Sequence, residues 1–489
     1  MFSLKNYFII LFVLMFNLLT AQDYHAINGS SYAGSLGVGN NPASIVHIPY
    51  AWDITPFAIQ FKQSTNAFKI ANYSLLSTPN NVTVAGENGN KKRFVLANQD
   101  IRLLNGRISL HSKAAIAFGI NIRNYMHATS SKTNWQDSSY TLADYLKINI
   151  NHVPLTGASA VSAWAEVYGT YAQTIFDDGY RLLNAGLTLK INRAVAGGYA
   201  RAEGINYKPF LSGSAAGYEL TTGSLQYGYS SNFDKIDSNN TSATNRKQFL
   251  QQPSISLGAG IGLEYIVLTD EDKSEGGDYA YDTKIAVSVI DIGSNKYTHG
   301  RSSRLAFAGL PGITDSLLEN KFSTVKNFED FNDSLKSISN AFIQVSGNFY
   351  IYHPTRLIIN VDQHLVHNFF INASLTLPII SLVSKKSLYL KDMNLLAITP
   401  RWEIKSLGAY MPVLLNNRNQ LWVGGAIKAG PILLGTHNLL NLFSKNKIQT
   451  GGLYLAFTIR PGKLYDPQAH YPKSKISKKV RKTLQCPPF

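Results

Sequence analysis

A glycine-rich stretch near the start of the chain raises the first chemical question. Gly34, Gly37 and Gly39 precede an Asn-Pro-Ala element at residues 41–43. Glycine loops bind phosphate where a strand leads into them and a helix follows. Here the spacing is G-x-x-G-x-G, the reverse of the dinucleotide fingerprint, and strand-like alternation follows instead of a helix. We therefore favour a different interpretation, in which the glycines let the backbone bend through a narrow space.

Other candidate chemistry is sparse. His364 and His367 have the look of a metal pair, but an i, i+3 pair on a strand points to opposite faces. The acidic loop at residues 270–278 could hold calcium, although it lacks the EF-hand order of ligands and a solvated loop is favoured. No G-x-S-x-G elbow occurs, so we expect no enzyme, no cofactor and no metal site. An enzymatic site built from scattered residues is the alternative that one sequence does not reveal.

The N-terminus has the layout of a secretory signal peptide. Lys5 precedes an apolar run at residues 7–19, and Thr20-Ala21 forms a small-residue end. We expect residues 1–21 to be removed before Gln22. The alternative, a membrane anchor, is disfavoured because a span needs about 20 apolar residues. No cysteine follows the cut, which also disfavours a lipid-modified N-terminus.

Composition excludes a small disulfide-stabilised module. The chain has 489 residues and one cysteine, Cys486, so no internal disulfide can form. After the signal, no segment has 18 consecutive apolar residues, which excludes a spanning helix by sequence. An exported chain can still cross a membrane as a closed β-barrel.

Alternation of apolar and polar residues is the strongest pattern. Residues 254–265, SISLGAGIGLEY, set isoleucine, leucine, alanine and tyrosine on one face against serine, glycine and Glu264 on the other. The same period of two occurs at 182–192, 114–124 and 452–462. Such alternation predicts strands whose two faces meet different surroundings.

A transmembrane barrel fits these strands better than a secreted β-sandwich, which alternation alone would also allow. The segments have about ten residues or more, the length that a tilted strand needs to cross a bilayer. Small and polar residues on one face suit a barrel lumen, and the apolar face then meets lipid. Aromatic residues recur near segment ends, as expected for interfacial girdles: Trp52, Tyr125, Tyr207, Tyr265, Trp402 and Tyr410. We predict an all-β, antiparallel outer-membrane barrel of about 14 strands, with 16 possible.

Sixteen segments are strand candidates. They are residues 51–63, 103–112, 114–127, 160–174, 183–194, 196–207, 217–230, 255–269, 280–293, 341–352, 355–364, 366–377, 394–405, 407–415, 420–429 and 451–460. Residues 315–342 interrupt the rhythm with apolar residues at three- and four-residue spacings, which predicts one or two amphipathic helices. A structured loop on the rim is favoured over a mobile lid. Residues 139–149 are a shorter helical candidate.

The charge is strongly positive, with a net value of +16. Part of it lies in residues 463–489, a basic tail that follows the last strand and is expected in the periplasm. The tail could contact acidic lipid headgroups or a partner, or be simply solvated. Nucleic acid is not an expected partner of an exported barrel.

Two regions resemble an uncharacterised family of Gram-negative outer-membrane barrels. They are LGVGNNPASIVHIPYAWDI at residues 36–54 and the closing hairpins at residues 398–443. That family is related to the long-chain fatty-acid transporter-like (FadL/OmpP1-like) barrels. The resemblance implies that residues 22–50 fold into the lumen as a plug and that residues 51–462 form the barrel. Some members of the family continue into a peptidoglycan-binding domain, in place of which this sequence has the short basic tail.

The resemblance also implies a function in the outer membrane. Passive passage of a hydrophobic or small ligand through a plugged lumen is the leading hypothesis. The positions expected to shape the constriction are Gly34, Gly37, Gly39, Asn41, Pro42 and Ala43. The alternative is a structural or assembly protein, or a partner of a secretion machine, without transport. Expected partners are outer-membrane lipid and, according to the hypothesis, a hydrophobic small molecule or secretion and envelope proteins.

Overall fold

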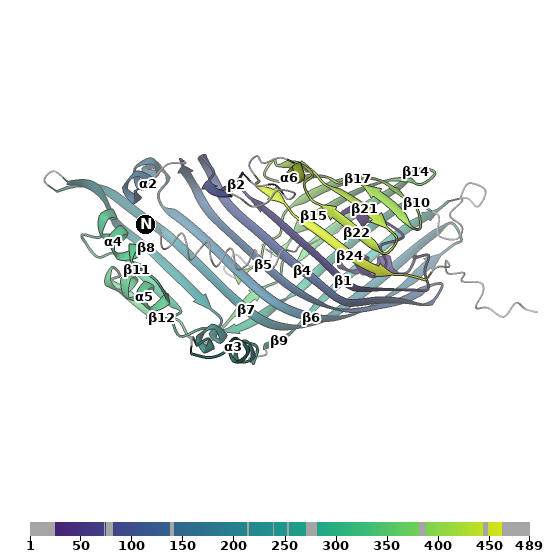
Figure 1. The fold of residues 1–489 in the computed structure, drawn as a ribbon, viewed down its shortest axis with the longest axis horizontal. Coiled ribbons are helices and arrows are strands. Elements are labelled where there is room, and N and C mark those ends of the chain that lie inside the picture. The colour runs from purple at the N-terminus through teal and green to yellow at the C-terminus, as the bar shows by residue number, and fades with distance from the viewer. Residues whose placement is uncertain are drawn as a thin grey trace, which may run out of the picture.

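The wall of the molecule is an antiparallel sheet that closes on itself (Figure 1), because its first strand pairs with its last. The computed structural model describes residues 25–72, 74, 82–136, 141–212, 215–237, 239–251, 254–269, 281–380, 388–443 and 448–461. The ring has 14 positions, which confirms the predicted barrel of about 14 strands.

The ring runs through long strands first and short ones last. In order, its positions are β1 (Trp52–Thr65), β4 (Gly89–His111), β5 (Ala114–Trp135), β6 (Leu155–Asp177), β7 (Arg181–Ser212), β9 (Ser254–Leu268), β10 (Tyr281–Thr298), β14 (Arg356–Val366), β15 (Phe369–Pro378), β17 (Leu395–Glu403), β18 (Leu407–Tyr410) with β19 (Val413–Asn416), β20 (Leu421–Val423) with β21 (Gly425–Ala429), β22 (Ile432–Thr436), and β23 (Thr450–Gly451) with β24 (Leu453–Ile459).

A second sheet region extends the barrel at one end. The first half of β7 pairs with β9, whereas its second half pairs with β8. We call this region the extension; it comprises β8 (Ala215–Tyr229), β11 (Arg304–Ala308), β12 (Ala341–Gln344), α4 (Asp315–Ser323) and α5 (Phe328–Ser337). In Figure 1 it lies at the left end of the molecule.

The remaining elements are short. They are β2 (Phe68–Ala71) paired with β3 (Thr83–Gly86), α2 (Leu142–Asn149), η4 (Ile150–His152), η5 (Ser231–Lys235), α3 (Ser242–Leu250), β13 (Asn348–Tyr352), β16 (Leu388–Tyr389) and α6 (Leu440–Phe443). No helix within these described residues is both long and apolar enough to span a bilayer.

The two ends of the barrel differ in their connections. At one end β4 joins β5, β6 joins β7, and β14 joins β15 through turns of only a few residues. At the other end the connections carry α2, the β2–β3 hairpin and the extension. Outer-membrane barrels have short periplasmic turns and longer extracellular loops. This asymmetry places the extension on the extracellular side.

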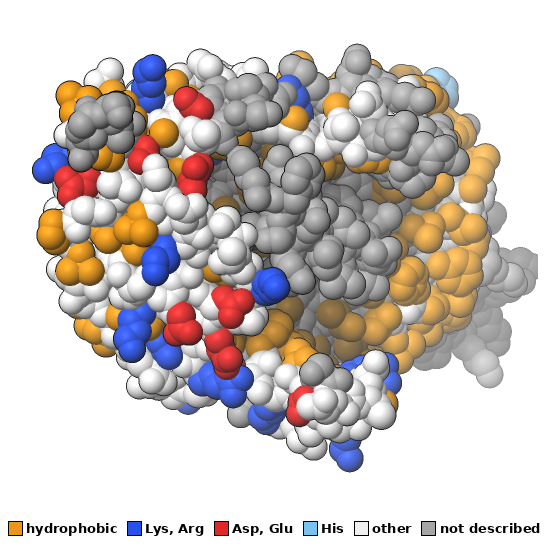
Figure 2. Space-filling model, turned by 60° about the vertical axis from the view of Figure 1, so that its left-hand side comes forward, with side chains coloured by type: hydrophobic (Ala, Val, Ile, Leu, Met, Phe, Trp, Pro, Cys, Tyr) orange, Lys and Arg blue, Asp and Glu red, His pale blue; other side chains and the backbone are white. Residues whose placement is uncertain are grey.

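The apolar faces of the strands point outward, as predicted. On β9, Ile255 and Leu257 are 66% and 75% exposed, whereas Glu264 on the opposite face is 4% exposed. Figure 2 shows hydrophobic side chains over the barrel wall and charged side chains gathered over the extension. A soluble sandwich would bury the apolar face instead. The wall is therefore built to face lipid.

The helical predictions are confirmed and several strand boundaries are corrected. Residues 315–342 form α4 and α5, and residues 139–149 contain α2. The candidates 183–194 and 196–207 are one continuous strand, β7, because its pairing partner changes without a turn. The sequence analysis missed β11 and β22, which have only five residues each and lack a full alternating pattern.

The predicted aromatic girdle is wrong for three of its residues. Tyr125 and Tyr410 are buried inside the barrel, where their hydroxyls contact Arg123 and Glu403. Tyr207 is also buried, and its hydroxyl donates to a carbonyl of α2. These rings have a polar partner on the inner face, which outweighs their affinity for the lipid interface.

Candidate functional site

The segment that precedes the first strand lies inside the ring of strands. Residues 25–50, here called the luminal segment, form three short helices, η1 (His25–Ile27), η2 (Gly34–Gly39) and η3 (Pro42–Ile45), and most of their residues are buried. Asn41 starts η3, since its side chain accepts the N–H of Ala43 at 2.9 Å and Pro42 presets the first turn.

Hydrogen bonds attach the luminal segment to strands on different sides of the ring. On β4, Arg102 donates to the Leu36 carbonyl at 2.8 Å and Arg107 donates to the Ile45 carbonyl at 2.7 Å. Across the lumen, Asn41 Nδ2 donates to the carbonyl of Leu263 on β9 at 3.1 Å. Bonds to opposite walls fix the segment within the barrel.

The predicted constriction residues lie close against the wall. Gly34 has φ +57°, and a Cβ on it would lie 2.5 Å from Asp53 Oδ2. On β7, a Cβ on Gly186 would lie 2.5 Å from the Ala43 nitrogen. On β9, a Cβ on Gly262 would overlap Asn41 Oδ1. The wall therefore needs glycine opposite residues 41–43, and Gly186 and Gly262 form their seat.

The other two predicted glycines are equally confined. A Cβ on Gly39 would lie 2.5 Å from Arg102 Nη2, and one on Gly37 would lie 2.9 Å from Ser44 Oγ. The cavities around the segment are small. One, beside Gly39 and Pro42, measures about 30 Å³, and a second, beside Asn40 and Asn41, also measures about 30 Å³. Each has room for little more than one water molecule.

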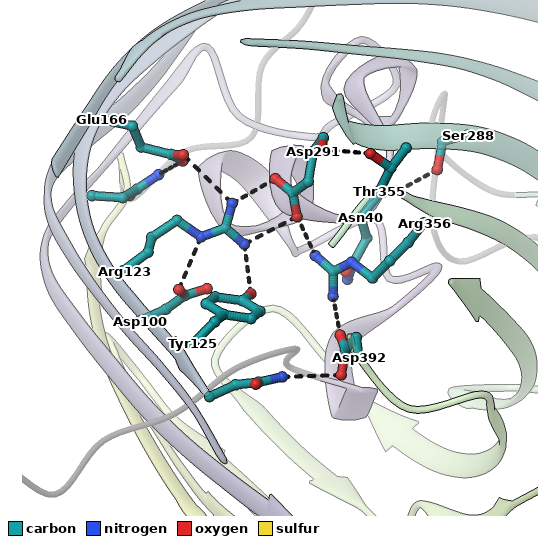
Figure 3. A network of polar contacts seen from close by, with 12 residues as sticks. Asn40, Asp100, Arg123, Tyr125, Glu166, Ser288, Asp291, Thr355, Arg356 and Asp392 are labelled. Atoms are coloured by element: carbon teal, nitrogen blue, oxygen red, sulfur yellow. Dashed lines mark hydrogen bonds and ion pairs between the residues drawn. The ribbon is translucent and has the colours of Figure 1, made fainter. Parts of the chain in front are cut away.

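A group of buried charges crosses the lumen from wall to wall (Figure 3). We call it the wall cluster; it comprises Lys62, Asp100, Arg123, Glu166, Lys190, Asp291, Arg356 and Asp392. Asp291 is its centre, since its carboxylate contacts Arg123 at 2.5 Å, Arg356 at 2.7 Å and Lys190 at 2.8 Å. These residues come from β5, β7, β10 and β14, so the cluster ties opposite walls together.

The wall cluster also holds a connection between wall strands inside the barrel. Asp392, between β16 and β17, accepts from Arg356 at 2.9 Å and from Asn98 at 3.0 Å, and lies 3.2 Å from Lys62. Leu390, beside it, is fully buried in an aromatic group with Trp164 and Tyr297.

A second group of buried charges holds the luminal segment. We call it the segment cluster; it comprises Asp362, Arg401, Glu403 and Lys428. Ser30 Oγ donates to Glu403 at 2.6 Å, and Arg401 donates to the Asn28 carbonyl at 3.4 Å. Nearby, Lys284 donates to Ser31 Oγ at 2.7 Å. Charged side chains of β10, β17 and β21 thus converge on residues 28–31.

Sequence reasoning missed both clusters and the wall glycines. The available indication was the position of Arg123, Glu264 and Arg401 on the polar faces of alternating segments, next to small residues. It does not reveal which strands face one another across the lumen. Of the two histidines considered as a metal pair, His364 is half-buried with its Nε2 2.7 Å from the His367 carbonyl, and His367 is exposed. The loop at residues 270–278 lies outside the described residues, among which no group of metal-ligating side chains occurs.

Two solved structures resemble this chain over most of its length at low sequence identity. The toluene transporter TbuX of Ralstonia pickettii is 10% identical, with a TM-score of 0.41, 91% of this chain covered and 99% of that one. A FadL homologue of Pseudomonas aeruginosa is 9% identical, with a TM-score of 0.39, 89% of this chain covered and 96% of that one. No curated protein matches the sequence.

A family model matches residues 42–437, which include Pro42 and Ala43, every residue of both charge clusters and most of the barrel wall. The match confirms the expectation of an uncharacterised family. The chain belongs to the family of unknown function DUF5723.

Proposed function

We propose that this protein is an outer-membrane transport barrel in which the luminal segment is a displaceable plug. The observation that carries the proposal is the attachment of the segment, in which hydrogen bonds from Arg102, Arg107, Lys284 and Asn41 accompany apolar contacts with the wall. Water or a polar solute can replace the hydrogen bonds at modest net cost, and a hydrophobic ligand can replace the apolar contacts.

Passage of a small or hydrophobic ligand then requires movement of the segment. The two cavities beside residues 39–42 measure about 30 Å³ each, far below the volume of a small-molecule site. A ligand enters from the extracellular rim, passes the wall cluster and reaches the seat formed by Gly186 and Gly262. Residues 41–43 move away from this seat and open the lumen toward the periplasmic end.

A structural or secretion-partner role is the second candidate. The wall cluster favours it, because ion pairs that join opposite walls make the lumen resistant to opening. On this hypothesis the luminal segment never leaves its seat.

A pair of engineered disulfides separates the two hypotheses. Ser35 Oγ lies 3.0 Å from Thr55 Oγ1, so S35C/T55C in a Cys486→Ser background links the segment to β1. Thr55 Oγ1 also lies 2.9 Å from Thr458 Oγ1, so T55C/T458C links β1 to β24 and leaves the segment free. Both variants carry a cysteine at position 55, but the first restrains the luminal segment and the second restrains only the wall.

Solute uptake into liposomes is the measurement. We expect the oxidised S35C/T55C barrel to lose uptake and to regain it on reduction, whereas T55C/T458C retains uptake in both states. Equal uptake by both oxidised variants contradicts the plug. Absence of uptake in wild type, in both reduced variants and after deletion of residues 22–50 contradicts transport and supports the structural role.

A further inference from the structure

A cavity lies at the fork of the wall, and it is larger than the two cavities beside the luminal segment. It measures about 320 Å³ and lies where β7 exchanges β9 for β8. Its lining includes Asn232 of η5, Ser254 of β9, Lys296 and Thr298 of β10, and Asn348 of β13. Small-molecule sites begin at about this volume.

Part of the lining of the cavity faces the outside of the wall, although Tyr297, on the inner face, also lines it. Along β10, Asn295 and Tyr297 are buried toward the lumen, where both contact Ser162. Because side chains of a strand alternate, Lys296 and Thr298 point to the opposite, outer face. Lys296 therefore presents its ammonium group to the surroundings of the barrel, not to the permeation path.

Two groups in the cavity are available to a ligand. Lys296 forms no ion pair with any described residue. Asn232 is 4% exposed, and its Nδ2 is fixed by the carbonyls of Val195 at 2.7 Å and Phe249 at 3.2 Å. Its Oδ1 is buried without a hydrogen-bond partner in the described structure. A buried acceptor left unpaired costs about 1–3 kcal/mol, so a donor on a ligand stabilises the site.

Along the barrel axis, the cavity lies at the height expected for lipid headgroups. Below it, the outer face is apolar at Ile255, Leu257 and Ile292. Beside it, Lys296 pairs in the sheet with Tyr350, an exposed aromatic residue of the kind found at membrane interfaces.

The elements next to the cavity have an interfacial composition. η5 and α3, at the lower edge of Figure 1, expose apolar Phe233, Ile236 and Leu250 beside basic Arg246 and Lys247. Apolar side chains next to basic ones suit a surface at the boundary between acyl chains and anionic headgroups.

We propose that this cavity binds the phosphorylated, hydroxyl-bearing headgroup of an outer-leaflet lipid. Lys296 pairs with the phosphate, and a hydroxyl of the glycerol or sugar donates to Asn232 Oδ1. Thr298 and Asn348, which share a hydrogen bond of 3.0 Å, add a hydroxyl and an amide group beside Lys296 for a polyol. The acyl chains then lie on the apolar face of β9. The lining of this site includes no residue of the luminal segment.

Native mass spectrometry of the full-length protein in detergent, titrated with phosphatidylglycerol or phosphatidylcholine, tests the proposal. We expect wild type to retain one phosphatidylglycerol and to lose phosphatidylcholine. Lys296→Gln is expected to weaken retention about tenfold or more, since a hydrogen bond to a charged group is lost. Thr298→Glu, at an exposed position, places a carboxylate beside Lys296 and is expected to weaken retention similarly.

Lys132→Gln on β5, an exposed lysine away from the cavity, is the matched control and should retain the lipid as wild type does. Heat-modifiable migration on gels verifies that each variant is a folded barrel. Retention unchanged in both Lys296→Gln and Thr298→Glu overturns the proposal. Equal affinity for soluble glycerol 3-phosphate overturns the assignment to a lipid and points to a free sugar phosphate.

Discussion

Two buried ionic clusters lie within one lumen, and they hold different things together. The wall cluster centres on Asp291 and joins strands of opposite walls, and its ion pairs involve no described residue of the luminal segment. The segment cluster centres on Glu403 and receives Ser30 of the luminal segment. The first cluster therefore maintains the shape of the barrel, whereas the second determines whether the segment stays in place.

Buried charges in the same lumen therefore have different structural roles. Removing one partner of a buried ion pair leaves the other charge unpaired in a medium of low dielectric constant. In the wall cluster the cost falls on the barrel itself. In the segment cluster the cost can be relieved by releasing residues 28–31, because water then reaches the exposed charges.

The largest effect is expected from Asp291→Asn. The substitution leaves Arg123, Lys190 and Arg356 without their shared carboxylate, and we expect a loss of about 3–5 kcal/mol of barrel stability. Urea unfolding in liposomes, followed by gel migration, measures it. Asp282→Asn, at an exposed position of the same strand, should change stability by no more than about 0.5 kcal/mol. Equal stability of the two variants would refute the role of Asp291.

Glu403→Gln is expected to act on the luminal segment instead. Ser30, Lys428 and Arg401 lose a charged partner, which weakens docking of the segment by about 1.5–3 kcal/mol. Thiol labelling of Ser44→Cys in the Cys486→Ser background should then accelerate by about tenfold or more. Asp291→Asn should leave the labelling rate of the same cysteine nearly unchanged. Similar acceleration by both variants would remove the distinction between the clusters.

Gly262→Ala probes the seat without altering charge. Its Cβ would overlap Asn41 Oδ1, so we expect overpacking to displace η3 at a cost of about 1–3 kcal/mol. Gly260→Ala, on the same face of β9, has its nearest neighbours at 3.6 Å and should be tolerated. Labelling of Ser44→Cys and liposome uptake should both rise for Gly262→Ala alone. Identical behaviour of the two alanine variants would show that residues 41–43 do not depend on this seat.

Ser31→Ala should give the smallest effect. It removes one hydrogen bond from Lys284, worth about 0.5–1.5 kcal/mol to docking of the segment. We expect labelling of Ser44→Cys to rise by a few-fold, with barrel unfolding unchanged. An effect as large as that of Glu403→Gln would mean that Lys284, rather than the segment cluster, controls docking.

The fold could be predicted from the sequence because its rule is local. In each strand, the alternation of apolar and polar residues predicts which side chains face outward and which face inward. Leu257 and Glu264 lie on the faces that this pattern predicts. The confinement of Gly34 and Asn41 followed from residue type and from the resemblance. The clusters could not be predicted, because Asp291 and Arg123 are 168 positions apart and meet only when the ring closes. Tyr125 follows Arg123 by two residues on β5, so alternation puts both on the inner face, and the girdle prediction did not use this.

The length of β7 has a mechanical consequence. With 32 residues at about 3.3 Å each, this single strand is roughly 105 Å long, several times what a tilted strand needs to cross a bilayer. Its hydrogen bonds pass from β9 to β8 without a turn, so a continuous paired strand, and not a hinge, joins the extension to the barrel. A force on the extension is therefore transmitted along β7 to Lys190, and through Lys190 to the wall cluster.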